Sequence, residues 1–306
     1  MIKIDSSFDN EGELNWLECV KQGNSEREIL ISTYCCHPSL ANDNLSGLVA
    51  SVQLFKYLSN IQTKFTYRLV VAPETIGIIS FLNQTDFSKF LGGMVLSCVA
   101  GPGKISIKYG YDKDHWINKA AILALEKVTN GDFITYPFVP NGSDERQYSS
   151  PGIGVVTPSI HKSKYYEYPE YHTSGDNLKF ISASNLLETL EVYKQWINNI
   201  ESYCKPKRTE MKCEFQLGKR GLYPDVGGSL GQSAHEENKF GHEVRKFNFN
   251  KKIKLTGMHL NSYGWLMHLA DGNNSNFDIA EKSKLPLHII NESIAIFHQN
   301  NLLNLE

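Results

Sequence analysis

The stretch that decides the fold is EILISTYCCHPSLANDNLSGLVASVQLFKYL, residues 28–58. Its first part, residues 28–34, predicts a buried strand. Residues 44–59 carry apolar side chains mostly at helical spacing and predict a helix. The polar segment between them places His37 just past the strand and Asp43 at the helix entry. A strand, a polar loop and a helix in this order are typical of an α/β fold.

The same alternation continues along the chain. Further strands are predicted in the segments YRLVVA, GMVLSCVA, KISIKYG, DFITY and GIGVVTPSI, and helices over residues 114–129 and 182–202. Strands that alternate with helices predict one α/β domain over residues 1–204, with a mostly parallel central sheet flanked by helices. Ligands of such sheets usually bind at the carboxyl ends of the strands.

The C-terminal third of the chain has a different texture. Residues 205–246 are rich in glycine and charge without clear periodicity, and we expect a connecting segment packed on the first domain. Residues 247–306 predict three helices, with a capping box at Ser275 and Pro286 at the first position of the last helix. This helix-turn-helix pattern predicts a winged-helix domain. Its last helix carries no lysine or arginine, so we do not expect DNA as a partner.

Composition narrows the function classes. The chain has 306 residues, 41% of them hydrophobic, and a formal net charge of -2, so it lacks the basic excess of a nucleic-acid-binding protein. No apolar run approaches the roughly 20 residues that span a membrane, and the N-terminus does not read as a signal peptide. The six scattered cysteines predict reduced thiols in a cytoplasmic protein. The oligomeric state stays open, with a homo-oligomer among the alternatives.

Ionisable side chains follow the predicted strands at comparable positions. They are His37, Asp43, Glu74, Asp144, Glu145, Arg146, His172 and Asp176. Each alone has an ordinary interpretation as a helix cap, a turn residue or a loop carboxylate. As a set they converge on one rim of the sheet, as the groups of an active site do. Imidazole and carboxylate ligands suit zinc, and a carboxylate beside a zinc-activated water can act as general base.

Two cysteines beside His37 introduce a second chemistry. A cysteine–histidine pair can form a nucleophile, so Cys36 must be considered for that role. Adjacent residues on a strand point to opposite faces, which would leave His37 poorly placed to activate Cys36. We therefore expect Cys35 and Cys36 to be buried packing residues.

Four segments carry a family resemblance. HPSLANDNLSG, APETIG, GSDERQYSSPG and YPEYHTSGDN occur in the order found in a bacterial family of aminopeptidase-like proteins. The chain resembles that family over nearly its whole length. The family joins a zinc-exopeptidase-like domain to a C-terminal winged helix and is often associated with surface-polysaccharide gene clusters. More distantly, the first domain resembles zinc aminopeptidases and glutaminyl cyclases.

The resemblance implies roles for individual residues. The implied metal ligands are His37, Asp43 and His172. Glu74 falls at the position of the general base. Thr75 and Cys98 stand where the aminopeptidases usually carry a ligand glutamate and a ligand aspartate. The resemblance therefore implies one zinc ion, with Cys98 as a fourth contact.

The resemblance also concerns length. The closer family usually carries a further region before the segment that matches IDSSFDNEGEL, and here that segment follows the first three residues directly. We therefore expect an N-terminally truncated form of the zinc-exopeptidase-like domain.

Two functions from different classes follow. The first is a zinc hydrolase of an amide bond, of aminopeptidase or amidase type, acting on a small-molecule or peptide-like substrate. In this hypothesis Glu74 moves the proton, while Asp144, Glu145 and Arg146 contact the substrate, with Arg146 binding a carboxylate. The alternative is a non-catalytic metal-binding protein of polysaccharide assembly or its regulation, which the changes at Thr75 and Cys98 favour.

Overall fold

The chain folds into two units. The computed structural model describes residues 3–7, 9–222, 247–249, 253–255 and 257–305. Contacts divide the chain into a first unit, Met1–Glu201, and a second unit, Ser202–Glu306. None of the helices in the described part of the chain is both long and apolar enough to cross a membrane.

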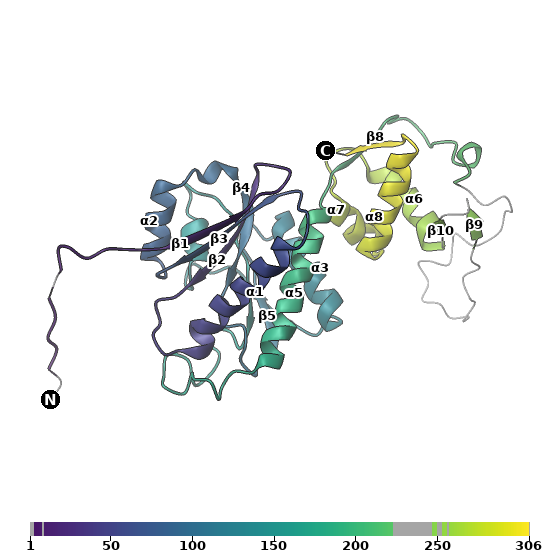
Figure 1. The fold of residues 1–306 in the computed structure, drawn as a ribbon. Helices are drawn as coiled ribbons and strands as arrows, with labels where there is room; N and C mark the ends of the chain where they lie inside the picture. The colour runs from purple at the N-terminus through teal and green to yellow at the C-terminus, as the bar shows by residue number, and fades with distance from the viewer. Residues whose placement is uncertain (1–2, 8, 223–246, 250–252, 256, 306) are drawn as a thin grey trace. The chain divides into compact units, whose positions relative to one another are not determined.

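The first unit is built on a seven-stranded sheet with the order β1-β3-β2-β4-β7-β5-β6 (Figure 1). Its strands are β1 (Leu17–Lys21), β2 (Glu28–Tyr34), β3 (Thr66–Ala72), β4 (Phe90–Leu96), β5 (Ile105–Lys108), β6 (Ile134–Tyr136) and β7 (Ser159–Lys162). The central strands β3, β2, β4 and β7 pair in parallel. β1 joins β3 antiparallel, β5 joins β7 antiparallel, and β6 is parallel to β5. The prediction of a mostly parallel central sheet is confirmed.

Helices cover both faces of this sheet (Figure 1). They are α1 (Gly47–Ser59), α2 (Ile76–Gln84), α3 (Trp116–Thr129), α4 (Glu145–Tyr148) and α5 (Ala183–Ser202), with short helical turns at Ala41–Ser46 and Phe87–Lys89. α5 is joined to α1 by a hydrogen bond from the Tyr57 hydroxyl to Asn198, and to α3 by one from Asn199 to the Ala120 carbonyl. α2 packs its Ile78 and Phe81 into a separate cluster with Leu30, Val70 and Val95 of the sheet.

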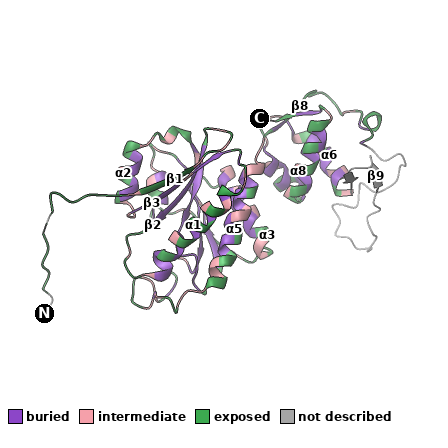
Figure 2. Ribbon diagram, viewed as in Figure 1, coloured by how far each residue is buried: buried purple, intermediate pink, exposed green. Residues whose placement is uncertain are grey.

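Burial on both faces explains the sequence of β2. All seven of its residues are buried, and Figure 2 shows β2 and β3 in the buried colour. Because helices cover both sides, successive side chains enter opposite halves of the core, and the strand need not alternate apolar with polar residues. The strand and helix predicted at the start of the chain are therefore confirmed, although α1 proper begins at Gly47 after the irregular turn Ala41–Ser46.

Some sequence predictions differ from the structure. In the segment GIGVVTPSI only the end is strand, because β7 begins at Ser159. β1 and α2 were not predicted at all. The residues of β1 are mostly exposed, so they lack the apolar pattern of the central strands. α2 has only nine residues and follows Pro73 closely, which made it read as part of a loop.

The described residues of the second unit form three α-helices and two small sheets. The helices are α6 (Gly257–Leu269), α7 (Asn276–Ser283) and α8 (Leu287–Gln299). β8 (Pro206–Arg208) pairs antiparallel with β11 (Leu303–Leu305), and β9 (Phe247–Phe249) with β10 (Ile253–Leu255). The capping box at Ser275 is present, and Pro286 lies at the N-cap of α8, one position before the predicted one. The three helices agree with the sequence, while their designation as a winged helix stays a prediction.

The connecting segment belongs to this second unit. β8 lies in it, followed by a short helical turn at Gly218–Arg220. Leu217 and Leu222 are buried in the core formed by α6, α7 and α8. This corrects the expectation that residues 205–246 pack on the first domain, as far as residue 222. The remainder of that segment, residues 223–246, lies outside the described residues.

One glycine of the central sheet tests this packing. A Cβ atom at Gly93 in β4 would lie 2.7 Å from the Leu30 Cβ on β2 and would also clash with the Leu30 carbonyl oxygen. We expect Gly93→Ala to lower the free energy of unfolding by about 1–3 kcal/mol, because overpacking forces the two strands apart. Gly152→Ala is the control, since nothing lies within 4 Å of its Cβ position. Urea unfolding measures both variants, and equal midpoints would contradict the prediction.

Candidate metal centre

The three predicted ligands meet at one point. His37, Asp43 and His172 each offer one ligand atom, and these atoms lie within 4.8 Å of one another. His37 lies in the loop after β2, Asp43 in the turn that leads into α1, and His172 in the loop after β7. The rings of His37 and His172 are 5.2 Å apart between centroids. The sequence prediction that these residues converge agrees with this geometry.

Asp43 provides a test of whether a metal ion fits. Its side chain is 1% exposed. Oδ1 accepts a hydrogen bond of 2.6 Å from the Tyr34 hydroxyl. Oδ2 lies 3.1 Å from His172 Nε2, yet it makes no hydrogen bond within the described part of the chain. A buried carboxylate oxygen without a donor is costly, and a cation held jointly with the two imidazoles would satisfy it. The residues present therefore fit a zinc ion.

Asp176 fixes the backbone that carries Asp43. Its Oδ1 accepts hydrogen bonds from the N–H groups of Ala41 (3.1 Å) and Asn42 (2.6 Å), and its Oδ2 accepts one from Asp43 (3.0 Å). The Tyr168 hydroxyl donates to Oδ2 at 3.0 Å. Asp176 is fully buried, so this carboxylate acts through the backbone of the metal-site turn.

Glu74 stands beside the ligands. Its Oε2 lies 3.9 Å from His37 Nε2, and 24% of its side chain is exposed. Burial raises the pKa of Glu74, while the nearby Ser143 hydroxyl and the charge of His37 act in the opposite direction. A carboxylate with a raised pKa accepts and releases a proton more readily near neutral pH, as a general base must.

A second group of potential ligands shares one histidine with the first: Cys36, His37 and Glu74. Cys36 Sγ lies 3.4 Å from His37 Nδ1. Cys35 and Cys36 are both exposed, so the prediction that they are buried packing residues was wrong. The strand ends at Tyr34, so the alternation of side chains along a strand does not apply beyond it.

Cys98 is separated from both groups. It lies two residues past β4, is completely buried, and belongs to neither group of potential ligands in the described chain. Its Sγ contacts the Ser97 hydroxyl at 3.4 Å. Burial raises the pKa of the Cys98 thiol. Because the Cys98 thiol lies in neither group of ligand atoms among the described residues, the structure does not bring it to the position of the fourth contact expected from the sequence.

The three residues expected to contact substrate have different surroundings. Asp144 and Glu145 are buried and do not line the cavity beside the site. Asp144 accepts a 2.7 Å hydrogen bond from the Thr75 N–H, and Glu145 pairs with buried Lys108 at 2.5 Å. Arg146 lines the cavity and donates to Thr75 Oγ1 at 3.1 Å. This corrects the expectation for Asp144 and Glu145, whose contacts hold the loops around the site.

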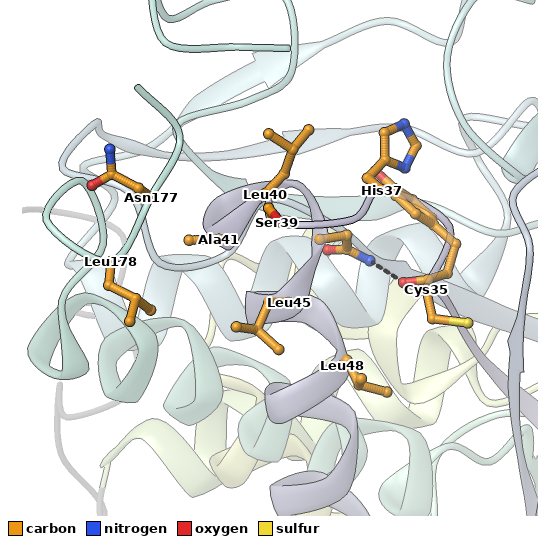
Figure 3. A pocket seen from close by; sticks show the side chains of 11 residues that line it. Cys35, His37, Ser39, Leu40, Ala41, Leu45, Leu48, Asn177 and Leu178 are labelled. Atoms are coloured by element: carbon orange, nitrogen blue, oxygen red, sulfur yellow. Dashed lines mark hydrogen bonds between the residues drawn. The ribbon is translucent and has the colours of Figure 1, made fainter. Parts of the chain in front are cut away.

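Two cavities adjoin the candidate centre. One of about 620 Å³ is lined by Glu74 and His172, and has room for a small-molecule ligand. Tyrosines and cations dominate the rest of its lining: Tyr34, Tyr136, Tyr165, Tyr166, Tyr171, Lys108, Arg146 and Lys164. The other, of about 320 Å³, adjoins His37 and is lined mainly by apolar side chains such as Leu45 and Leu178 (Figure 3). Sequence reasoning missed the lysines and tyrosines, because they lie on four separate segments with no common motif.

The buried Asp144 predicts a pH-dependent stability. Burial raises the pKa of Asp144 to about 8, although the hydrogen bond from the Thr75 N–H opposes this. The folded chain therefore binds this proton more tightly than the unfolded chain, whose aspartate pKa is about 3.9. The contribution to stability is complete below that unfolded pKa and is lost as the pH rises through about 8.

Asp144→Asn should remove this part of the pH dependence. We expect the urea midpoint of the metal-free parent to fall between about pH 5 and about pH 8, and that of the variant to fall less. Asp114→Asn, a change at an exposed aspartate, is the control. If parent and Asp144→Asn show the same slope against pH, the carboxyl group is not the source.

Comparisons with known proteins agree with this fold. A protein from Clostridium acetobutylicum, named a polysaccharide biosynthesis protein with an aminopeptidase-like domain, is 35% identical over 309 residues, which cover 99% of this chain and 64% of that protein. This chain therefore spans less than two thirds of the relative's length. A crystal structure of a protein from the same organism, described as a peptidase, has a TM-score of 0.75 at 32% identity and covers 95% of this chain and 60% of its own.

More distant structures share the fold alone. A zinc aminopeptidase from Bacillus subtilis has a TM-score of 0.54 at 14% identity, covering 60% of this chain and 49% of its own. A glutaminyl cyclase from Porphyromonas gingivalis has a TM-score of 0.51 at 14% identity, and the match covers 61% of this chain and 77% of the cyclase. The family model described as Domain of unknown function (DUF4910) matches residues 7–203. The chain belongs to this DUF4910 family, and its first unit has the fold of the zinc aminopeptidases and glutaminyl cyclases.

Proposed function

We propose that the chain is a zinc-dependent hydrolase of an amide bond. The observation that carries the proposal is the position of Glu74, a half-buried carboxylate that lines the 620 Å³ cavity together with the ligand His172. It lies 3.9 Å from the ligand His37. A potential base, a set of metal ligands and room for a substrate therefore occur together, which is the arrangement that metal-assisted hydrolysis requires.

The chain's own residues have distinct parts in this proposal. His37, Asp43 and His172 hold the zinc ion, which, when bound, acts as a Lewis acid that polarises a carbonyl group and activates water. Glu74 accepts a proton from the attacking water and passes it to the nitrogen of the leaving amine. Arg146, exposed at the cavity wall, is available to bind a substrate carboxylate.

The name of the Clostridium acetobutylicum relative suggests a biological setting. That protein is named for polysaccharide biosynthesis, and we extend the setting to this chain as part of the proposal. A second candidate function is a non-catalytic metal-binding protein of polysaccharide assembly. It is favoured by Thr75 at a position where the distant relatives' pattern has a ligand, and by the buried thiol of Cys98 at another.

Metal content tests the ligand set. We expect about one zinc ion per chain by elemental analysis, and loss of most of it in His172→Ala, because that variant removes one of three ligands. His288→Ala, at an exposed histidine of the second unit, should keep the parent's metal content. Two metal ions per chain, or unchanged content in His172→Ala, would contradict the assignment.

Glu74→Gln tests the base. The amide keeps the shape of the side chain but cannot accept the proton, so we expect turnover of an amide substrate to fall by about 10²–10⁴-fold. Metal content and the unfolding midpoint should stay at the parent's values. Glu26→Gln, at an exposed glutamate, is the matched control.

The remaining outcomes separate the two candidate functions. Loss of zinc together with activity in Glu74→Gln would make Glu74 a ligand. Parent-level activity in this variant would remove it from the mechanism. A zinc-loaded parent with no turnover on any amide would favour the binding protein.

A further inference from the structure

The 620 Å³ cavity has an excess of positive charge. Three cations line it, Lys108, Arg146 and Lys164, against the single acidic residue Glu74. Lys108 is neutralised, because its ammonium nitrogen lies 2.5 Å from a carboxylate oxygen of Glu145 and both side chains are 1% exposed. Arg146 has no carboxylate within 4.0 Å among the described residues, and its one hydrogen bond runs to the Thr75 hydroxyl. Arg146 therefore faces a ligand without an acidic partner, while Lys164 has one acidic partner, the half-exposed Glu167 at 3.6 Å.

Lys164 is held in place by its neighbours. Its side chain is 11% exposed, and Nζ lies 4.8 Å from the ring centroid of Tyr136 and 4.5 Å from that of Tyr165. Nζ donates to the Tyr165 carbonyl at 3.1 Å and lies 3.6 Å from the Glu167 carboxylate, half of which is exposed. An ammonium group has three donors, so one remains. A cation fixed between two rings loses little conformational entropy when an anion binds.

Lys164 also stands where two cavities adjoin. A further cavity of about 460 Å³ lies against β5 and the loop after β7, and both Tyr136 and Lys164 line it as well as the 620 Å³ cavity. A molecule that extended from Glu74 into this further cavity would pass Lys164. The two cavities together suit a ligand longer than a single amino acid or a single sugar.

These charges oppose a free amino group. An α-ammonium group bound in this cavity would share it with Arg146 and Lys164, and like charges in a partly buried cavity repel one another. A negatively charged group would instead form charge-assisted hydrogen bonds with both cations. The lining of the 620 Å³ cavity therefore suits a blocked or acylated nitrogen and an anionic group bound there, whereas the further cavity is also lined by Glu167 and Glu170.

We infer that the cavity takes an elongated, anionic amide without a free amino terminus, whose negative group binds Lys164 and Arg146. The inference rests on the proposed function for the position of the amide bond beside Glu74, but the charge preference itself does not require turnover. Such an anion has two sources, an acidic saccharide that carries an N-acetyl group and an N-acylated peptide with a free carboxylate. Both share the carboxylate that the two cations would bind.

Calorimetric titration of the zinc-loaded chain tests the preference. The saccharide arm compares the chondroitin disaccharide, which has a carboxylate, with the neutral diacetylchitobiose. The peptide arm compares N-acetyl-Ala-Ala with its C-terminal amide and with free Ala-Ala. We expect the acidic probe of at least one arm to bind about tenfold or more tightly than its neutral partner, as a charged hydrogen bond would provide. The arm with the larger difference in affinity between acidic and neutral probes shows whether the anion belongs to a saccharide or to a peptide.

Variants connect the preference with Lys164. Lys164→Gln should lower the affinity for the acidic probe by about tenfold and leave the affinity for the neutral probe unchanged. Lys164→Arg should keep most of the affinity for the acidic probe. Lys89→Gln removes an exposed charge outside both cavities and should change neither probe. The unfolding midpoint of each variant shows whether it is folded. If Lys164→Gln does not fold, the comparison of acidic and neutral probes is made with Lys164→Arg instead.

Several results would overturn the inference. They are equal binding of acidic and neutral probes, tighter binding of free Ala-Ala than of its acetylated form, no binding of any probe, or an unchanged preference in Lys164→Gln. The proposed function fails separately. A chain that binds the acidic probe through Lys164 but hydrolyses no amide keeps this inference and loses the hydrolase assignment, and Glu74→Gln should bind the acidic probe no less tightly than the parent.

Discussion

The candidate centre depends on one buried carboxylate that binds backbone. Asp176 accepts hydrogen bonds from the backbone N–H groups of three successive residues, Ala41, Asn42 and Asp43. In this way it joins the loop after β7 to the turn before α1. An asparagine in place of Asp176 would turn its NH₂ group towards at least one of these backbone N–H groups. Two donors would then face each other, and both would lack a hydrogen-bond acceptor. Because His172 lies only four residues before Asp176, the same interaction brings the histidine ligand to the carboxylate ligand.

Asparagines on either side of Asp43 extend this constraint. Asn42 donates to the Ser163 carbonyl and accepts from the Ala100 N–H. Asn44 donates to the carbonyls of Tyr34 and Leu96 and accepts from the Cys98 N–H. Each amide thus satisfies backbone groups at strand ends where the sheet ladder stops. The turn is fixed by protein contacts before any metal binds, and such preorganisation holds ligands near their working geometry.

Two buried carboxylates beside the 620 Å³ cavity, those of Asp144 and Glu145, are held by contacts within the protein. Glu145 neutralises Lys108 and also accepts a hydrogen bond from the Tyr165 hydroxyl at 2.9 Å, while neighbouring Asp144 holds the backbone of Thr75. These contacts hold the short helix α4, which carries Arg146 at the cavity wall. The carboxylates of Asp144 and Glu145 are therefore occupied inside the protein, and the cavity is lined by Glu74 together with its cations.

The local sequence by itself determined the strand over residues 28–34, the helices with strong apolar periodicity, and the rim where His37, Asp43 and His172 gather, because these follow from short-range patterns and from the geometry of parallel strands. The burial of individual side chains and the ion pairs that they form could not be predicted from such patterns. Glu145 and Arg146 are adjacent in helix α4, yet Glu145 is buried against Lys108 of strand β5 and Arg146 lines the cavity. Likewise, only the tertiary structure placed Lys164 between two tyrosine rings. The physical reason is that burial and ion pairing depend on segments distant in the chain, which only the packed sheet brings together.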